Sequence, residues 1–336
     1  MTLSQTINRP EYDFLMHSPL GAAHNILFVT YGGSYAYGTN IGCSDIDIRG
    51  VCMANKSELL GLQHFEQFVD SNTDTTIYAF PKAARLFLAC NPNAIEMLGC
   101  RTDSYALVSL TGRMLLDNAA LFLSNRCINS FSGYAAQQLH RLENAIARDK
   151  MSQEEQEKHI LRSCQSACDA MSSRYQKIPE GGLRLYVEKS EKHSMDSEIF
   201  MDVDLSRYPL RDFCAIWNDL NSICKNYGNV SSKNRKKDDN HIAKHMMHLF
   251  RLNLMCCDLL ETGKIVTYRD KDHDFLMEIR KGRFIDAAGQ VLPEFYEALR
   301  ETEVRLSYAK DHSVLPDEPD YEKVEDLIME INRRAI

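Results

Sequence analysis

The amino-acid sequence predicts an α+β protein: a small mixed sheet followed by a mainly helical region that contains an inserted hairpin. Strand-like and helix-like segments alternate over the first hundred residues, whereas the apolar periodicity beyond residue 103 is mainly that of helices. Two strand-like segments near residues 181–190 and 198–205 flank a polar turn and interrupt these helices. We therefore expect one domain over residues 1–102 and a second over residues 103–336.

The sheet is predicted from short apolar runs that end in turn residues. Residues 25–31 form a β-branched run ending at Gly-Gly, residues 46–53 alternate apolar and polar side chains, and residues 75–80 form a third strand. A helix is expected over residues 81–90, with proline in its first turn, and a short helix near residue 92. These elements predict helices packed on a small sheet.

The helical region is predicted from apolar side chains at spacings of three and four. The expected helices cover residues 105–123, 130–148, 154–175, 210–227, 241–260, 273–281, 293–309 and 321–334.

Length and composition indicate a globular protein. The 336 residues are 44% hydrophobic, which is enough for two domains with buried cores. No apolar run is long enough to span a bilayer, and the first residues lack the pattern of a signal peptide, so we expect a cytoplasmic protein without a membrane partner. The sequence does not indicate an oligomeric state.

Cysteine and charge patterns exclude several classes of protein. The 11 cysteines form no CxxC pair, which favours reduced thiols, although Cys164 and Cys168 share a helix face on which a metal could bind. The net charge of −8 argues against a protein that coats nucleic acid. The basic residues 233–237 are expected in a solvated loop, with a phosphate-binding loop as the alternative.

The residues that indicate a chemical function lie in one segment, residues 31–50, with the sequence YGGSYAYGTNIGCSDIDIRG. Gly32, Gly33 and Ser34 follow a predicted strand and precede a predicted helix, so backbone amides and the serine hydroxyl can approach a phosphate. Asp45 and Asp47 open the next predicted strand, and alternation along a strand would place both carboxylates on one face. Two carboxylates at this spacing suit Mg²⁺ or Mn²⁺, and together the two features indicate phosphoryl or nucleotidyl transfer.

This segment resembles the signature of the DNA polymerase beta superfamily of nucleotidyltransferases, and more narrowly the RNA-ligase-associated nucleotidyltransferases. The second resemblance includes GS-x-x-YG, SD-x-D-x-RG, an NPN-x-x-E segment at residues 91–96, FSGY at residues 131–134, and K-H-x-x-H-L-x-R at residues 244–251. It spans most of the chain outside residues 164–237.

The superfamily implies a third carboxylate on a neighbouring strand. Asp74, immediately before the strand at residues 75–80, is the first choice, and Asp70 and Glu96 are the alternatives. By the same resemblance, Ser132, Gly133 and Tyr134 are expected to line a nucleotide pocket.

A basic stripe on the helix at residues 241–260 is the second informative pattern. Lys244, His245, His248 and Arg251 fall at spacings of three and four on a helix that is otherwise apolar. Charges that are desolvated need a negative partner, and a nucleoside triphosphate would supply it. The alternatives are pairing with Asp238 and Asp239, or zinc bound by His241 with two of these histidines.

Each of three residues near the glycine turn allows two interpretations. Arg49 could contact a phosphate or pair with a carboxylate of the site. Tyr35 and Tyr37 could stack on a base or pack against the turn.

The expected function is transfer of a nucleoside monophosphate from a nucleoside triphosphate to an acceptor hydroxyl. Asp45, Asp47 and Asp74 would hold Mg²⁺ or Mn²⁺, and Gly33, Ser34, Arg49 and the basic helix would bind the nucleotide. The resemblance suggests an RNA or transfer RNA end as the acceptor. The alternatives are a non-catalytic nucleotide- or RNA-binding module with the same fold, and a toxin-like transferase that modifies a protein or transfer RNA.

Overall fold

The computed structural model describes residues 3–17, 26–149, 158, 161–162, 164–165, 168–169, 174–175, 182–191, 197–233, 241–287 and 289–334. The chain forms two compact units. The first contains residues 1–141 and 243–336, and the second contains residues 142–242. The C-terminal helices thus belong to the same compact unit as the N-terminal sheet.

The first unit is built on a five-stranded mixed sheet with the strand order β3-β4-β2-β1-β5. The strands are β1 (Ile26–Tyr31), β2 (Ile48–Cys52), β3 (Gln67–Asp70), β4 (Thr75–Ala79) and β5 (Tyr105–Ala106). β2 and β4 run parallel, with Ile48 opposite Thr75, and the other neighbouring strands are antiparallel. This register brings the first residues of β2 and β4 to the same end of the sheet.

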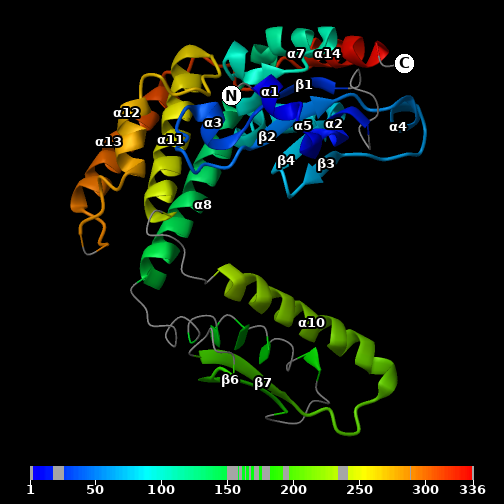
Figure 1. Cartoon of the computed structure of the whole chain (residues 1–336), viewed down its shortest axis with the longest axis vertical. Helices are drawn as coiled ribbons and strands as arrows, with labels where there is room; N and C mark the ends of the chain where they lie inside the picture. Colours follow the sequence, from blue (N-terminus) through cyan, green and yellow to red (C-terminus); the bar gives the residue numbers. More distant parts are fainter. Residues whose placement is uncertain are drawn as a thin grey trace. The chain divides into compact units, whose positions relative to one another are not determined.

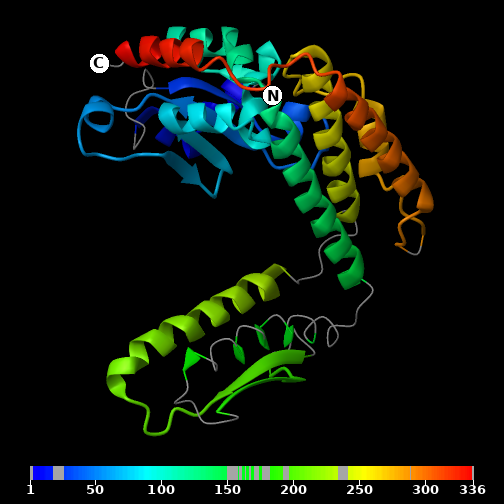
Figure 2. The same cartoon turned by 180° about the vertical axis from the view of Figure 1, so that it is seen from behind.

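Helices cover both faces of this sheet (Figure 1). Those preceding residue 120 are α1 (Leu3–Ile7), α2 (Phe14–His17), α3 (Gly33–Tyr37), α4 (Lys56–Leu60), α5 (Phe80–Leu88), α6 (Pro92–Ile95) and α7 (Leu110–Asp117). Those of the C-terminal part are α11 (His241–Thr262), α12 (His273–Arg280), α13 (Pro293–Asp311) and α14 (Tyr321–Arg333). Figures 1 and 2 show α7 and α14 side by side above the sheet, and α11 beside the long α8 (Arg126–Asp149).

Two buried clusters flank the sheet. All six residues of β1 are buried, as expected for an inner strand covered on both faces. Leu27 and Phe28 belong to the larger cluster, which includes residues of α5, α8, α11, α13 and α14. Ile26, Val29 and Tyr31 belong to the smaller one, with residues of α1 and α3.

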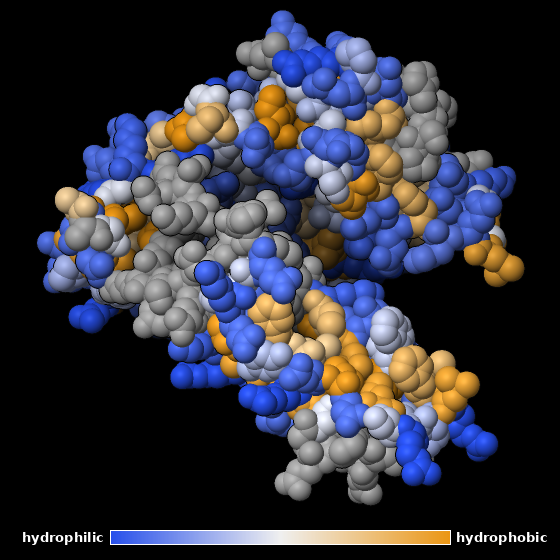
Figure 3. Space-filling view, turned by 60° about the horizontal axis from the view of Figure 1, so that its bottom comes forward, coloured by the Kyte–Doolittle hydropathy of each residue, from blue (hydrophilic) through white to orange (hydrophobic). Residues whose placement is uncertain are grey.

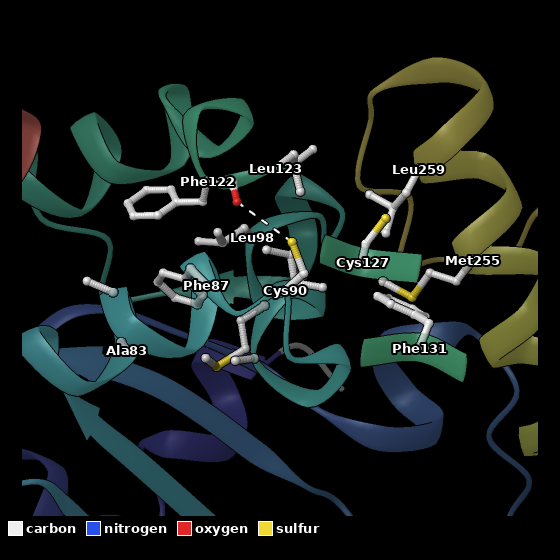
Figure 4. Close-up of a cluster of buried hydrophobic side chains, with 14 of the residues drawn as sticks. Ala83, Phe87, Cys90, Leu98, Phe122, Leu123, Cys127, Phe131, Met255 and Leu259 are labelled. Atoms are coloured by element: carbon white, nitrogen blue, oxygen red, sulfur yellow. Dashed lines mark hydrogen bonds between the residues drawn. The ribbon is translucent and has the colours of Figure 1, made fainter. Parts of the chain in front are cut away.

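The larger cluster joins α8 and α11 to the sheet domain. Figure 4 shows Phe131 of α8 and Met255 of α11 packed against one another. The buried Cys90 thiol follows α5 and donates a hydrogen bond to the carbonyl oxygen of Phe122 at 3.8 Å. Burial of this apolar surface fixes the start of α8 and the C-terminal half of α11 beside the sheet.

The second unit contains the predicted hairpin. β6 (Leu183–Lys189) and β7 (Ser197–Val203) pair antiparallel, and α10 (Leu210–Lys233) follows them. The buried core of the unit includes Ile216 and Leu220 of α10. Figure 3 shows apolar residues gathered on the surface of this unit, and α10 exposes Phe213 and Trp217, whose rings are stacked.

The α+β fold class, the mixed sheet and the inserted hairpin are confirmed. The helix predicted over residues 105–123 is wrong in its first part, because Tyr105 and Ala106 form the edge strand β5 and helix begins only at Leu110. The helix expected over residues 154–175 lies largely outside the described residues, as do residues 234–240, while Lys233 still belongs to α10.

The domain boundary expected after residue 102 stays a prediction, because one compact unit can hold more than one domain.

None of the helices in the described ranges is both long enough and apolar enough to cross a bilayer.

Gly112 and Gly133 provide a matched test of this packing. A Cβ atom on Gly112 in α7 would lie 1.9 Å from the Leu27 carbonyl oxygen, whereas one on Gly133 in α8 would meet nothing within 4 Å. We expect Gly112→Ala to destabilise the protein by about 1–3 kcal/mol, and Gly133→Ala to stabilise it by up to about 1 kcal/mol. Urea unfolding measures both changes. Equal effects of the two substitutions would contradict the close contact between α7 and β1.

Candidate active site

The site is centred on the glycine turn that follows β1. Gly33 has a φ of +54°, and a Cβ atom there would lie 2.0 Å from Oδ2 of Asp47. The Gly32 amide donates a hydrogen bond to the Asp47 carbonyl oxygen at 2.8 Å. Only a residue without a side chain lets the Asp47 carboxylate lie directly against this turn. The Asp47 side chain thus lies against the glycine turn, as predicted.

Asp45 and Asp47 precede β2, which begins at Ile48. The prediction that both open a strand was therefore wrong, and strand alternation does not orient their side chains. The Asp45 side chain is exposed and makes no ion pair within the described ranges, so its orientation depends on the loop before it.

Asp74 lies beside Asp47 because β2 and β4 are parallel and in register. The Asp74 carbonyl oxygen accepts a hydrogen bond from the Ile48 amide at 3.1 Å. The Asp74 carboxyl group acts on Asp47 as a neighbouring acid and raises its pKa. Asp74 has a φ of +45°, a backbone conformation that costs energy for a residue with a side chain and that recurs at functional sites.

The other two candidates for the third carboxylate are engaged elsewhere. Asp70 accepts hydrogen bonds from the Thr73 amide at 3.0 Å and hydroxyl at 2.6 Å, in the turn between β3 and β4. Glu96 is buried and bound to Arg251.

Arg49 links the two neighbouring carboxylates. Its Nη2 lies 3.3 Å from a carboxylate oxygen of Asp47 and 3.3 Å from one of Asp74. Its Nη1 donates to the carbonyl oxygens of Ile48 at 2.9 Å and Asp74 at 2.6 Å. Of its two interpretations, carboxylate pairing is the one observed.

The electrostatics of the pair favour a bound cation. Burial and the neighbouring Asp74 raise the pKa of Asp47 to about 6, while Arg49 and Lys244 act in the opposite direction. Two adjacent carboxylates supply the oxygen ligands that Mg²⁺ and Mn²⁺ prefer, and a divalent cation would relieve their repulsion. In the described ranges, no three His, Cys, Asp or Glu side chains are placed to hold a metal together. The predicted set of Asp45, Asp47 and Asp74 is thus not assembled as three metal ligands, and a metal at Asp47 and Asp74 would take its further ligands from water or substrate oxygens.

A buried polar cluster joins the glycine segment to α11. Arg251 of α11 is 4% exposed, and its Nη1 donates to Oε2 of Glu96 at 3.2 Å. The same oxygen accepts a hydrogen bond from the Tyr37 hydroxyl at 2.7 Å, and the guanidinium lies 3.8 Å from the centroid of the Tyr37 ring. The negative partner of Arg251 is therefore Glu96, a partner that the sequence did not indicate.

The N-terminal half of α11 presents the remaining basic residues. Lys244 is exposed and acts electrostatically on Asp47, which places it near the carboxylates. His245 Nδ1 forms a 2.6 Å hydrogen bond with Nε2 of Gln138 in α8. Burial, Arg251 and Lys244 lower the pKa of His248 well below its ordinary value, so it is neutral at neutral pH. The side chain of His241 lies outside the description, so zinc binding by three histidines stays untested.

The remaining predicted residues pack around this centre. The Ser34 hydroxyl is half-buried and has no hydrogen-bond partner in the described chain. Tyr35 stacks on Tyr31 with ring centroids 5.3 Å apart, so the packing interpretation applies to both Tyr35 and Tyr37. The Tyr134 hydroxyl accepts a hydrogen bond from Asn91 at 2.8 Å, whereas Gly133 is exposed.

One residue near the site was missed by the sequence analysis. Arg280 of α12 is buried and donates hydrogen bonds to the loop that precedes Asp45. No local pattern distinguishes it from other arginines at helix ends.

The sequence matches the RNA repair pathway DNA polymerase beta family over residues 12–179, half of the chain. The chain belongs to this family. Membership implies the nucleotidyltransferase-like fold of DNA polymerase beta, and the matched residues include Asp45, Asp47 and Asp74. The match ends before β6, so the basic helix α11 lies beyond it.

No curated protein and no solved structure matches this family member significantly.

The raised pKa of Asp47 predicts a pH-dependent effect of Asp47→Asn on this polymerase beta family protein. Its pKa is about 6 in the folded state against an ordinary 3.8, so the protein loses stability as the pH rises from about 4 to about 6, where the unfolded chain is ionised and the folded state still holds the proton. In metal-free buffer at pH 8, the variant should be more stable by about 2 kcal/mol, and the gain should shrink toward zero as the pH falls to 4. Thermal unfolding at each pH measures this difference in stability. Asp45→Asn is the exposed control, and a gain that does not depend on pH would contradict the assignment.

The Glu96–Arg251 pair yields a second prediction. Because each single substitution leaves a buried charge without its partner, Glu96→Gln and Arg251→Met should each cost about 3–5 kcal/mol of folding free energy. The double variant should lose less than the sum of the two, since neither charge remains. Urea unfolding of the four proteins measures the coupling. Strictly additive losses would show that the two side chains stabilise the fold independently.

Proposed function

We propose that this protein is a metal-dependent nucleotidyltransferase that moves a nucleoside monophosphate from a nucleoside triphosphate to an acceptor hydroxyl and releases pyrophosphate. The observation that carries the proposal is that Asp47 and Asp74 share one arginine, Arg49, beside the Gly33 turn. Membership in the polymerase beta family supports the same class of reaction. The carboxylates, the close backbone approach and the basic group are what a polyphosphate with its cation requires.

The proposed roles follow from where each side chain lies. Asp47 and Asp74, with Asp45, would hold Mg²⁺ or Mn²⁺, and the bound cation would neutralise charge on the phosphates. Gly33 and the Ser34 hydroxyl bind phosphate oxygens. Arg49 keeps the two carboxylates together through its contacts with both.

The basic side chains of α11 have separate roles in this proposal. Lys244, which is exposed, contacts the triphosphate directly. His248 is uncharged at neutral pH and therefore acts as a hydrogen-bonding group, with His245 fixed beside it by Gln138. Arg251 acts on the nucleotide indirectly, because its guanidinium already contacts Glu96 and Tyr37.

Asp74 is the carboxylate that we assign to the acceptor. It is the more exposed of the two carboxylates that Arg49 contacts, with 59% of its side-chain surface accessible against 22% for Asp47. In the reaction it orients the acceptor hydroxyl and accepts its proton while the hydroxyl oxygen attacks the α-phosphorus. The bond to the pyrophosphate oxygen breaks as the new phosphodiester bond forms.

An RNA end is the acceptor that we propose, in a cytoplasmic protein. The description of the family as belonging to an RNA repair pathway supports it. The net charge of −8 means that RNA would be held by a local basic surface.

Asp47→Ala tests the reaction, with Asp70→Ala as the control because Asp70 lies in a turn on the same sheet. Each radiolabelled nucleoside triphosphate is incubated with Mg²⁺ and total RNA, total protein or a small-molecule extract. We expect label to enter RNA with the wild type and with Asp70→Ala, and a loss of at least about 1000-fold with Asp47→Ala. Label in protein would instead support the toxin-like transferase.

The non-catalytic binding module is distinguished by the same preparations. Retained transfer by a folded Asp47→Ala variant would remove the proposed mechanism. Nucleotide that raises the unfolding temperature equally with and without Mg²⁺, together with no transfer to any acceptor, would favour the binding module.

A further inference from the structure

Arg280, the last residue of α12, reaches from the C-terminal helices to the loop between α3 and the carboxylates. It is 7% exposed. Its Nη1 donates a hydrogen bond to the carbonyl oxygen of Thr39, and its Nη2 donates one to the Ser44 hydroxyl at 3.1 Å. One guanidinium therefore connects both ends of the segment at residues 39–44.

Arg280 forms no ion pair with an acidic residue in the described ranges, although a buried guanidinium normally does. Burial lowers its pKa, and the Cys43 thiol, rather than a carboxylate, acts in the opposite direction. Two neutral acceptors on a single loop offset the cost of its burial instead. This arrangement makes the position of the loop depend on the arginine.

The loop leads directly to Asp45. Thr39 is tied to α3 by its amide, which donates to the Ser34 carbonyl oxygen at 2.9 Å. Ser44 closes the loop, because its hydroxyl also accepts a hydrogen bond from the Ile41 amide at 2.9 Å. Between Ser44 and β2, the anchored backbone atom is the Asp47 carbonyl oxygen, bound to Gly32. Asp45 thus lies between one anchor made by Gly32 and one made by Arg280.

We infer that Arg280 is a positioning residue for the metal site: by holding Ser44, it sets the direction in which Asp45 presents its carboxylate beside Asp47. The inference rests on the proposed function. A direct contact between Arg280 and a phosphate is the less favoured role, because protein acceptors already engage both terminal nitrogens.

Mn²⁺ binding without nucleotide tests this role, measured from the electron paramagnetic resonance signal of free Mn²⁺. Arg280→Gln should weaken Mn²⁺ binding about tenfold or more, the usual cost of losing a group that orients a metal ligand. Arg280→Lys, which keeps the charge and can reach one acceptor, should recover part of the affinity. Lys281→Gln is the matched control, because Lys281 is the adjacent, exposed residue, and it should bind Mn²⁺ as the wild type does.

Ser44→Ala provides a second variant that removes a single acceptor. We expect it to weaken Mn²⁺ binding severalfold, and its effect should be smaller in the Arg280→Gln background, since the hydrogen bond between the two residues is already lost there while the one from the Ile41 amide is not. It keeps the test decisive if Arg280→Gln does not fold.

Each outcome has a distinct meaning. Wild-type Mn²⁺ affinity in folded Arg280→Gln or in Ser44→Ala would overturn the inference and leave the proposed function intact. Unchanged Mn²⁺ affinity with weakened ATP binding would overturn it in favour of the phosphate contact. A wild-type protein that neither binds Mn²⁺ nor transfers nucleotide would refute the proposed function and the inference together.

Discussion

The buried ion pair between Glu96 and Arg251 is the interaction on which the arrangement of the site depends. Glu96 accepts hydrogen bonds from Tyr37 and Arg251, which belong to segments far apart in the chain. Two buried charges are stable only together, so the pair specifies one position of α11 relative to the glycine segment. The Tyr37 ring against the guanidinium adds a contact that depends on the same geometry.

Further hydrogen bonds extend this connection. The Glu96 carbonyl oxygen accepts a bond from the Thr267 hydroxyl at 2.6 Å, and the Arg269 amide donates to the Tyr37 carbonyl oxygen at 3.1 Å. The segment after α11 therefore holds the same two residues through their backbone. Lys244, which acts electrostatically on Asp47, lies on the helix that this network fixes. The proposed nucleotide site thus combines one end of the sheet with a helix that lies far away in the sequence, because buried polar contacts join them.

Much of the sheet could be predicted from the sequence, because its inner strands are short apolar runs bounded by glycine or polar residues. β1 and β4 were expected within a residue of their observed bounds. The edge strands β3 and β5 were not expected, since an edge strand is partly exposed and its residues lack a continuous apolar pattern. The start of β2 was misplaced because Ser44–Asp47 alternates like a strand while its backbone forms a loop.

Local sequence determined which groups the candidate site contains: a glycine turn able to accept a close neighbour, acids within a few residues of it, and a helix with a basic stripe. These features depend on side-chain type and on residue spacing over short stretches of sequence. The tertiary structure alone decided that Asp74 meets Asp47, through the parallel register of β2 and β4. It also decided that Arg251 pairs with Glu96 and that Arg280 reaches Ser44. Packing across the whole chain selects such partners, and no local sequence pattern indicates which distant residue will make the contact.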